Sequence, residues 1–192
     1  MKVGIFSGSF DPIHTGHAMV ANYAAQWLDL AEVWIMVSRL NPFKSNSLPE
    51  SDTHRINMAE LAVKDTPKVK ASDFELGLPL PSYTYLTLSR LRERYPDNEF
   101  VLIIGSDNWN NFSKWRNSDD IIREFPIYIY PRPGYPLVKE TLPENVKLME
   151  NVPLASISSS FIRESVKEGK NLNHFLPEGV FDYILKNSLY KK

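Results

Sequence analysis

The sequence predicts an α/β fold, a doubly wound and mostly parallel sheet with helices on both faces. Strand-like apolar runs alternate with amphipathic helical runs along the whole chain. The first strand, helix and strand together occupy only about forty residues, which is typical of a right-handed parallel crossover. Residues 99–104 form the most apolar run, which indicates a central strand that is covered on both faces.

The first half of the chain contains four of the expected strands and three of the helices. Short apolar runs bounded by turn signals predict strands over residues 2–6, 32–37, 69–74 and 99–104. Amphipathic runs predict helices over 14–28, 52–64 and 82–94, and residues 38–49 form a polar loop that contains proline. Ser82 is expected to cap the third helix, which Tyr95-Pro96 ends.

The second half begins with a loop-rich segment over 105–116. It continues with a short helix over 118–122 and strands over 126–130 and 146–149. A serine-rich start predicts a helix over 157–167, and a last helix is expected from Pro177. The apolar residues that we expect on the buried stripe of this last helix are Val180, Phe181, Ile184 and Leu185.

Length and composition indicate a single domain of 192 residues, with an α/β core over 1–156 and a C-terminal helical segment over 157–192. Hydrophobic residues make up 43% of the chain, which is enough for a core, and a net charge of −1 argues against a nucleic-acid partner. The absence of Cys excludes disulfides, thiolate metal sites and a Cys nucleophile. With no apolar run of membrane-spanning length and no signal-peptide pattern, we expect a cytoplasmic protein without a membrane partner.

Residues 7–17 join the first strand to the first helix and carry the strongest motif of the chain. Ser7, Gly8 and Ser9 make a turn that is small enough for a ligand to touch the backbone. His14 and His17 stand three residues apart at the helix start, where unpaired amides and the helix dipole favour an anion. These residues alone leave three interpretations open: a phosphate site, a weak metal pair and a chance pair.

Three helix starts lack the acidic residues that commonly occupy a first turn. The helices expected from 14, 82 and 158 carry hydroxyls, imidazoles or bare amides there instead. The other helix starts carry Glu50 and Asp52, Asp119 and Asp120, and Glu178. Ser and Thr are good caps for any single helix, but three such starts in one chain favour several negatively charged groups on the ligand.

Further candidate residues follow the central strand and open the serine-rich helix. Gly105 permits close approach at the sheet edge where α/β ligands bind, and Asp107 could accept from ribose hydroxyls, order a Mg²⁺ hydration shell or cap a turn. Trp115 could stack on a flat heterocycle or belong to the core. Arg163, about one turn into its helix, offers a planar fork of donors that suits phosphate.

As a whole, residues 8–17 resemble the last ten positions of the signature of the nucleotidyltransferases related to class I aminoacyl-tRNA synthetases. That signature is Gly-(Gly/Ser)-(Thr/Ser)-Phe-Asp-Pro-(Ile/Val)-His-x-Gly-His. Residues 157–163, Ile-Ser-Ser-Ser-Phe-Ile-Arg, resemble the second signature of these enzymes, with Ser160 in place of the commoner Thr. Gly105, Asp107 and Trp115 resemble a signature of one subfamily, the nicotinate/nicotinamide mononucleotide adenylyltransferases.

Two further segments are similar to that subfamily but depart from its pattern. Ser82-Tyr83-Thr84 matches the segment that binds the pyridine nucleotide, although Leu86 replaces an Asp that usually follows. Asn41-Pro42-Phe43-Lys44 stands where the family usually has Pro-Pro-His-Lys. Lys44 is kept, while Phe43 replaces the His and leaves any role of that position in doubt.

The resemblance implies a Rossmann-like sheet and an enzyme that transfers the adenylyl group of ATP to nicotinate mononucleotide. The products would be nicotinate adenine dinucleotide and pyrophosphate, formed by direct in-line attack without a covalent intermediate. His14, His17 and Arg163 would be catalytic. The other ATP-binding residues that it implies are Gly8, Ser9, Phe10, Gly105, Asp107, Ile157, Ser158 and Ser159. The mononucleotide-binding residues that it implies are Ser7, Lys44, Ser82, Tyr83, Thr84 and Trp115.

Mg²⁺ is the expected cofactor, carried by the ATP phosphates and ordered at most by Asp107 rather than held in a protein cage. Three alternatives to this function remain at this point. The acceptor could be nicotinamide mononucleotide or phosphopantetheine, or the chain could be an ATP-binding regulatory module that does not catalyse transfer. The sequence also leaves the oligomeric state open, a homo-oligomer included.

Overall fold

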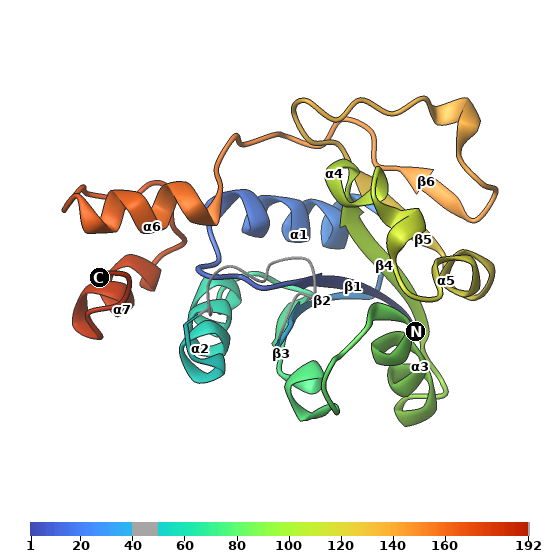
Figure 1. Cartoon of the computed structure of the whole chain (residues 1–192), viewed down its shortest axis with the longest axis horizontal. Helices are drawn as coiled ribbons and strands as arrows, with labels where there is room; N and C mark the ends of the chain where they lie inside the picture. Colours follow the sequence, from blue (N-terminus) through green and yellow to red (C-terminus); the bar gives the residue numbers. More distant parts are fainter. Residues whose placement is uncertain (40–49, 192) are drawn as a thin grey trace.

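The computed structural model describes residues 1–39 and 50–191, which form one parallel sheet between two layers of helices (Figure 1). Its strands lie side by side in the order β3-β2-β1-β4-β5-β6, and every neighbouring pair is parallel. They are β1 (Lys2–Gly8), β2 (Glu32–Val37), β3 (Val69–Ser72), β4 (Glu99–Gly105), β5 (Ile127–Tyr130) and β6 (Val146–Leu148). The predicted α/β class and doubly wound sheet are confirmed.

Helices connect the strands as the sequence predicts, with a few short turns added. The α-helices are α1 (Thr15–Trp27), α2 (Asp52–Val63), α3 (Thr84–Arg94), α4 (Ser106–Trp109), α5 (Ser118–Glu124), α6 (Ser159–Lys167) and α7 (Val180–Lys186). The 3₁₀ turns are η1 (Phe74–Gly77), η2 (Phe112–Lys114) and η3 (Lys139–Thr141). Within the described ranges, no helix has both the length and the apolar character required to cross a membrane.

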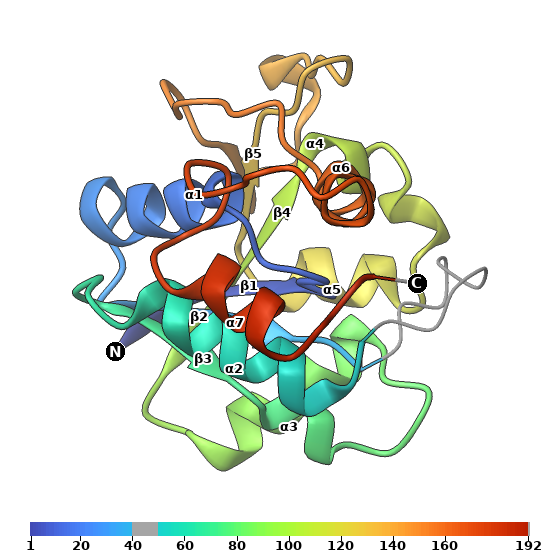
Figure 2. The ribbon, with the colours of Figure 1, turned by 90° about the vertical axis from the view of Figure 1, so that its left-hand side faces the viewer.

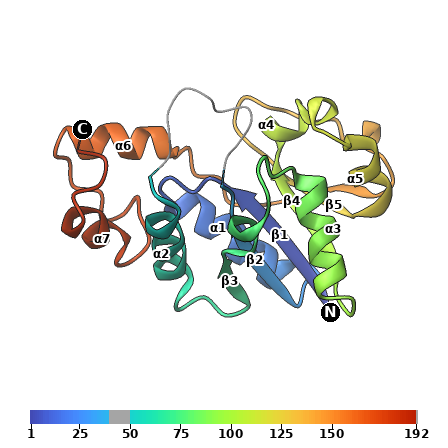
Figure 3. The ribbon, with the colours of Figure 1, turned by 60° about the horizontal axis from the view of Figure 1, so that its bottom comes forward.

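Each face of the sheet has its own core. On one face, α1, α2, α6 and α7 pack over strand residues such as Phe6, Ile35 and Ile103. On the other face, α3 and α5 cover Ile5, Leu102 and their neighbours, and Figure 3 brings α3 to the front of the sheet. The alternation of side chains along a strand separates these two sets, because successive residues point to opposite faces.

The last two helices pack onto the same face as α1 and α2. Ile162 of α6 and both Val180 and Ile184 of α7 are fully buried in that core. Figure 2 shows α7 lying beside α2, far from it in the sequence. This packing brings the serine-rich start of α6 back toward the first turn of the chain.

Four sequence predictions about these elements need correction. The strand expected over 69–74 ends at Ser72, because its pairing with β2 ends at Met36, and Phe74 begins the turn η1 instead. Ser7 and Gly8, expected in the turn after the first strand, belong to β1, whose pairing with β2 continues to Gly8. The last helix begins at Val180, since Gly179 has a left-handed φ of 78°, which a helix interior does not accept. Glu178 therefore lies before that helix, and Leu185, expected in its buried stripe, is 45% exposed.

The chain reverses its direction of winding between β1 and β4. From β1 it proceeds through α1 to β2 on one side, and β4 leads to β5 on the other side. Ligands of open α/β sheets bind in the crevice at the carboxyl ends of the two strands that flank such a point. Gly8 ends β1 and Gly105 ends β4, so two of the predicted glycines border this crevice.

Candidate active site

Two imidazoles lie against each other at the start of α1. His14 is the N-cap and His17 stands three residues later, and their ring centroids are 3.6 Å apart with an angle of 20° between the planes. The backbone N–H of His14 donates to Nδ1 of His17 at 3.3 Å. A neutral His17 therefore carries its proton on Nε2, which can donate to a ligand oxygen.

His14 is almost fully enclosed, at 2% exposure. Burial, together with the positive charge of Arg132, lowers the pKa of His14 to about 4, so the imidazole is neutral at pH 7. Its side chain faces the backbone N–H of His17 in a capping box, although buried Nδ1 makes no hydrogen bond of full geometry within the described residues.

The lowered pKa of His14 predicts a pH-dependent stability. The folded value is about 4 and the unfolded value 6.5, so the unfolded chain takes up this proton first as the pH falls. Stability from this group is complete above pH 6.5 and decreases toward pH 4, by up to about 3 kcal/mol. Urea denaturation gives the free energy of unfolding of wild type and of His14→Asn between pH 4 and pH 8. The wild-type value relative to that of the variant should decrease as the pH falls. A difference that stays constant with pH would contradict the buried neutral imidazole.

A buried arginine holds the signature turn in place. Arg55 of α2 is 0% exposed, and its Nη1 donates to the carbonyl oxygens of Ser9 and Ser38, both at 2.6 Å. Nε donates to the carbonyl of Glu50 at 3.1 Å, and Nη2 donates to Asp52 Oδ1 at 2.6 Å. One side chain thus fixes the turn after β1 to the end of β2 and the start of α2.

The start of α6 lies against the same turn, although the two segments are far apart in the sequence. Ser159 Oγ donates to the carbonyl of Pro12 at 2.9 Å. Arg163 Nη1 donates to the carbonyl of Asp11 at 2.7 Å, and its Nη2 donates to Ser160 Oγ at 3.2 Å. The two segments that resemble family signatures therefore meet at one place.

The serine hydroxyls of α6 have partners inside the protein. Ser158 caps the helix, as its position predicts, by accepting from the backbone N–H of Phe161 at 3.2 Å. Ser159 uses its only hydroxyl proton in the bond to Pro12. An anion at this start would accordingly meet backbone amides of the first turn, which carries no acidic residue.

The turn after β4 leaves a carboxylate oxygen without a partner. A Cβ on Gly105 would collide with Oδ1 of Asp107, so only glycine allows this side chain to fold back so closely. Asp107 Oδ1 is buried and accepts no hydrogen bond within the described structure, and Arg132 Nε lies 3.9 Å from it. This oxygen is therefore a candidate acceptor for a ligand donor.

The start of α3 differs from the sequence prediction, because Ser82 does not cap it. The helix begins at Thr84 with Tyr83 at the N-cap and no capping side chain. Ser82 is buried, and its Oγ donates to Glu75 Oε1 at 2.8 Å, while Ser7 Oγ donates to Oε2 at 3.5 Å. Burial raises the pKa of Glu75. A buried carboxylate requires donors, and it takes the hydroxyl that would otherwise have capped the helix.

The segment after η2 reaches the start of α3. The guanidinium of Arg116 lies 4.8 Å from the ring centroid of Tyr83. The adjacent Trp115 is half-buried and packs against Phe112, with ring centroids 5.0 Å apart. An open cleft of 320 Å³ lies here, lined by residues 79–81, Tyr83, Tyr85, Leu86, Arg116 and Asn117.

The remaining predicted site residues differ in how they could reach a ligand. The ring of Phe10 is 2% exposed and packs edge-on against His17, so any ligand contact would come from its backbone. Ile157 is partly buried against the core. Lys44 and Phe43 lie outside the described residues.

Comparisons with known proteins fit this geometry. A family model described as cytidylyltransferase-like matches residues 5–165. A probable nicotinate-nucleotide adenylyltransferase of Bacteroides thetaiotaomicron is 48% identical over 184 residues, which cover 96% of this chain and 91% of that protein. A protein of the same name from Flavobacterium johnsoniae is 44% identical, with both chains covered completely.

The chain belongs to the nicotinate-nucleotide adenylyltransferase family. Among solved structures, it resembles Plasmodium falciparum nicotinic acid mononucleotide adenylyltransferase complexed with NaAD, with a TM-score of 0.83 at 25% identity. That superposition covers 98% of this chain and 97% of the other.

This member of the adenylyltransferase family also has site residues that the sequence prediction missed. Arg132 stands two residues after the end of β5, and the sheet-edge rule that selected Asp107 could have selected it too. Arg55 lies on the helix face that carries apolar residues such as Met58 and Ala59. That position is only a weak sequence indication of a buried cation. Glu75 gave no signal, because its burial depends on how the chain folds over it.

Proposed function

We propose that this protein joins ATP and nicotinate mononucleotide to form nicotinate adenine dinucleotide and pyrophosphate, and that residues 1–192 act as one nucleotidyltransferase domain. The observation that carries the proposal is the meeting of the two signature segments, α1 start and α6 start, at the crevice between β1 and β4. The family relationship over nearly the whole chain supports the same activity.

The triphosphate of ATP would lie between the starts of α1 and α6. An oxygen of the acceptor's 5′-phosphate attacks the α-phosphorus of ATP, and the bond from that phosphorus to the bridging oxygen of pyrophosphate breaks in line. His14 and His17 would bind the α-phosphate and the leaving group, while Arg163 and the amides at Ser158 and Ser159 would hold the outer phosphates. The protein contributes position and positive potential rather than a covalent intermediate.

The nucleoside part of ATP would lie near the ends of β1 and β4. The backbone of Gly8, Ser9 and Phe10 would line the phosphate side, with Ile157 across from them. The close turn at Gly105 would admit the nucleotide, and Asp107 Oδ1 would accept from ribose hydroxyls, which its lack of a partner supports.

Mg²⁺ would enter with the ATP phosphates and neutralise their charge. Within the described ranges, no three His, Cys, Asp or Glu side chains gather as a metal cage would require. The orphaned Oδ1 of Asp107 could accept from a water of the ion's hydration shell. The residues present therefore fit an ion that the substrate carries.

The nicotinate mononucleotide would bind on the α3 side of the crevice. Because the hydroxyls of Ser7 and Ser82 turn toward Glu75, these residues would offer backbone groups rather than hydroxyls. The amides near Tyr83 and Thr84 would meet the pyridine carboxylate at a helix start without acidic residues, and Trp115 would stack on the ring. Lys44 would be a secondary phosphate contact.

Pyrophosphate release tests this function directly. The purified protein with Mg²⁺ and ATP is given nicotinate mononucleotide, nicotinamide mononucleotide or phosphopantetheine in separate reactions. We expect kcat/KM for the nicotinate compound to exceed the others by at least about tenfold, because a pyridine carboxylate suits the acid-free start of α3. Preference for another acceptor would contradict the proposal, and so would a failure to release pyrophosphate with any of the three acceptors.

Removal of the Trp115 ring tests the placement of the acceptor. Trp115→Ala is expected to raise KM for the mononucleotide about tenfold or more, since stacking on an aromatic ring is worth about 1–3 kcal/mol. KM for ATP should change little. Trp109→Ala is the matched control, because Trp109 also packs on Phe112, with centroids 5.0 Å apart. If both variants change both constants equally, Trp115 is a core residue.

A further inference from the structure

The segment after α7 turns back and buries a tyrosine beside the first signature. Ser188 and Tyr190 have φ values of 55° and 60°, a left-handed conformation that costs a non-glycine residue about 1–2 kcal/mol. Leu189 between them is 4% exposed, and Tyr190 is 8% exposed. Two strained residues within three positions persist only where the surrounding contacts impose them.

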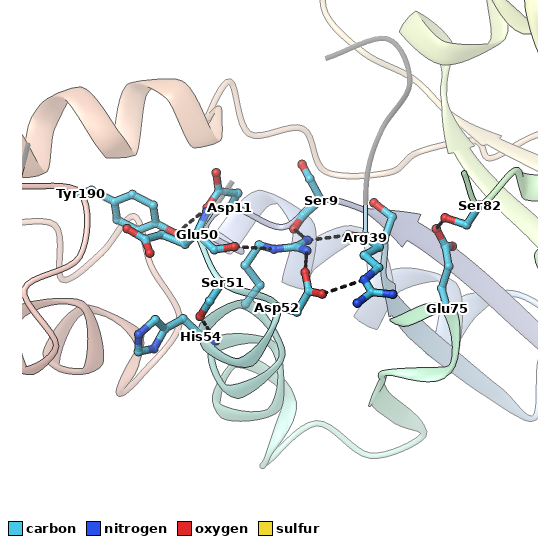
Figure 4. A network of polar contacts seen from close by, with 12 residues as sticks. Ser9, Asp11, Arg39, Glu50, Ser51, Asp52, His54, Glu75, Ser82 and Tyr190 are labelled. Atoms are coloured by element: carbon cyan, nitrogen blue, oxygen red, sulfur yellow. Dashed lines mark hydrogen bonds and ion pairs between the residues drawn. The ribbon is translucent and has the colours of Figure 1, made fainter. Parts of the chain in front are cut away.

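The tyrosine hydroxyl holds a carboxylate of the signature turn. Tyr190 Oη donates to Asp11 Oδ1 at 2.8 Å, and the backbone N–H of Glu50 donates to the same oxygen at 3.2 Å. Figure 4 shows Tyr190, Asp11 and Glu50 together beside the turn. Burial and the Asp11 carboxylate raise the pKa of Tyr190, so its hydroxyl remains a donor.

The same carboxylate lies close to the arginine of the second signature. Asp11 Oδ2 is 3.9 Å from Arg163 Nη1, which instead donates to the backbone carbonyl of Asp11 at 2.7 Å. Asp11 is only 8% exposed, so water solvates its carboxylate poorly and the group is stabilised by nearby hydrogen-bond donors. Without the tyrosine hydroxyl, rotation of this carboxylate would allow the long ion pair to shorten into a bidentate one, which a guanidinium prefers.

We propose that Tyr190 is a positioning residue for Arg163. Its hydroxyl holds the Asp11 carboxylate in an orientation in which the ion pair with the guanidinium stays long, at 3.9 Å, so that the positive charge stays available for phosphate. The proposal rests on the proposed function in one respect, that Arg163 binds the outer phosphates of ATP. The proposal assigns a role in ATP binding to Tyr190, which lies 27 positions after that arginine in the sequence.

The direct test is the affinity for an ATP analogue in Tyr190→Phe, which keeps the ring and removes the hydroxyl. Calorimetry with Mg²⁺ and α,β-methylene-ATP should show a Kd about five- to tenfold higher than that of wild type, the size expected for partial loss of one contact to phosphate. KM for nicotinate mononucleotide should stay within about twofold. This split is informative because a purely structural loss would lower stability without changing the affinity of the folded protein.

Tyr183→Phe is the matched control. Its hydroxyl bonds to His54 Nδ1 at 2.9 Å and accepts from Asn57 Nδ2 at 2.8 Å, so it joins α7 to α2 away from the turn. This variant should lose stability and keep the wild-type Kd. If it weakens the analogue as much as Tyr190→Phe does, the effect is a general consequence of loosening α7, and the proposal is wrong.

A second background separates the proposed route from other routes. In Arg163→Ala, the further change Tyr190→Phe should leave Kd for the analogue unaltered, because the group on which it acts is gone. An equal loss in both backgrounds, or no loss in the single variant, would overturn the proposal. Failure of the proposed function is distinguishable, since it would appear as a wild type that releases no pyrophosphate with nicotinate mononucleotide.

Discussion

Replacement of His17 by alanine is expected to lower kcat about hundredfold while the protein remains folded. Removal of a single well-aimed donor to transition-state charge typically costs about that much. His17 is suited to the role because its Nδ1 accepts from the backbone N–H of His14. The proton of the neutral ring is then on Nε2, which can donate to a phosphate oxygen. The measurement is pyrophosphate release at saturating ATP and mononucleotide, with circular dichroism to verify the fold.

The control for His17→Ala is a second partly buried imidazole. His54 bonds to the hydroxyl of Tyr183 at 2.9 Å and takes part in packing between α2 and α7. His54→Ala should reduce stability and leave kcat within about twofold of wild type. Near-normal turnover in His17→Ala would contradict the assignment of phosphate chemistry to the start of α1. The proposed function would then lose its main support.

Local patterns predicted the strands and the two histidines well, for a physical reason. Apolar runs bounded by turn residues give the bounds of β2, predicted over 32–37, because burial on both faces depends on the run itself. The stacking of His14 and His17 follows from their spacing of three residues on one helix, which places them as neighbours. Such features require no knowledge of distant segments.

Contacts between distant segments could not be predicted in this way. Serine is a good helix cap, so Ser82 was expected to cap α3, but the buried Glu75 takes its hydroxyl. Leu185 fits an apolar stripe, yet α7 buries only part of its surface and leaves this side chain exposed. The contact of Arg163 with Asp11 was not predicted, because no local rule joins residues so far apart in the sequence.

Replacement of Arg55 by leucine is expected to reduce the free energy of unfolding by about 3–5 kcal/mol, the usual loss when one partner of a buried ionic network is removed. Three backbone carbonyls and the Asp52 carboxylate would each lose a donor. Because a domain of this size is stable by only about 5–15 kcal/mol, such a variant would be close to unfolding. The midpoint of urea denaturation measures the loss.

Two companion variants decide what Arg55 contributes. Arg39→Leu removes only the exposed partner of Asp52, at 3.2 Å, and should cost less than about 1 kcal/mol. Arg55→Lys keeps the charge but lacks the planar fork that reaches Ser9 and Ser38 together, so an intermediate loss is expected. If Arg55→Leu is as stable as Arg39→Leu, the turn after β1 is held by its own packing. If the losses follow the expected order, the turn after β1 owes its position to a fully buried cation.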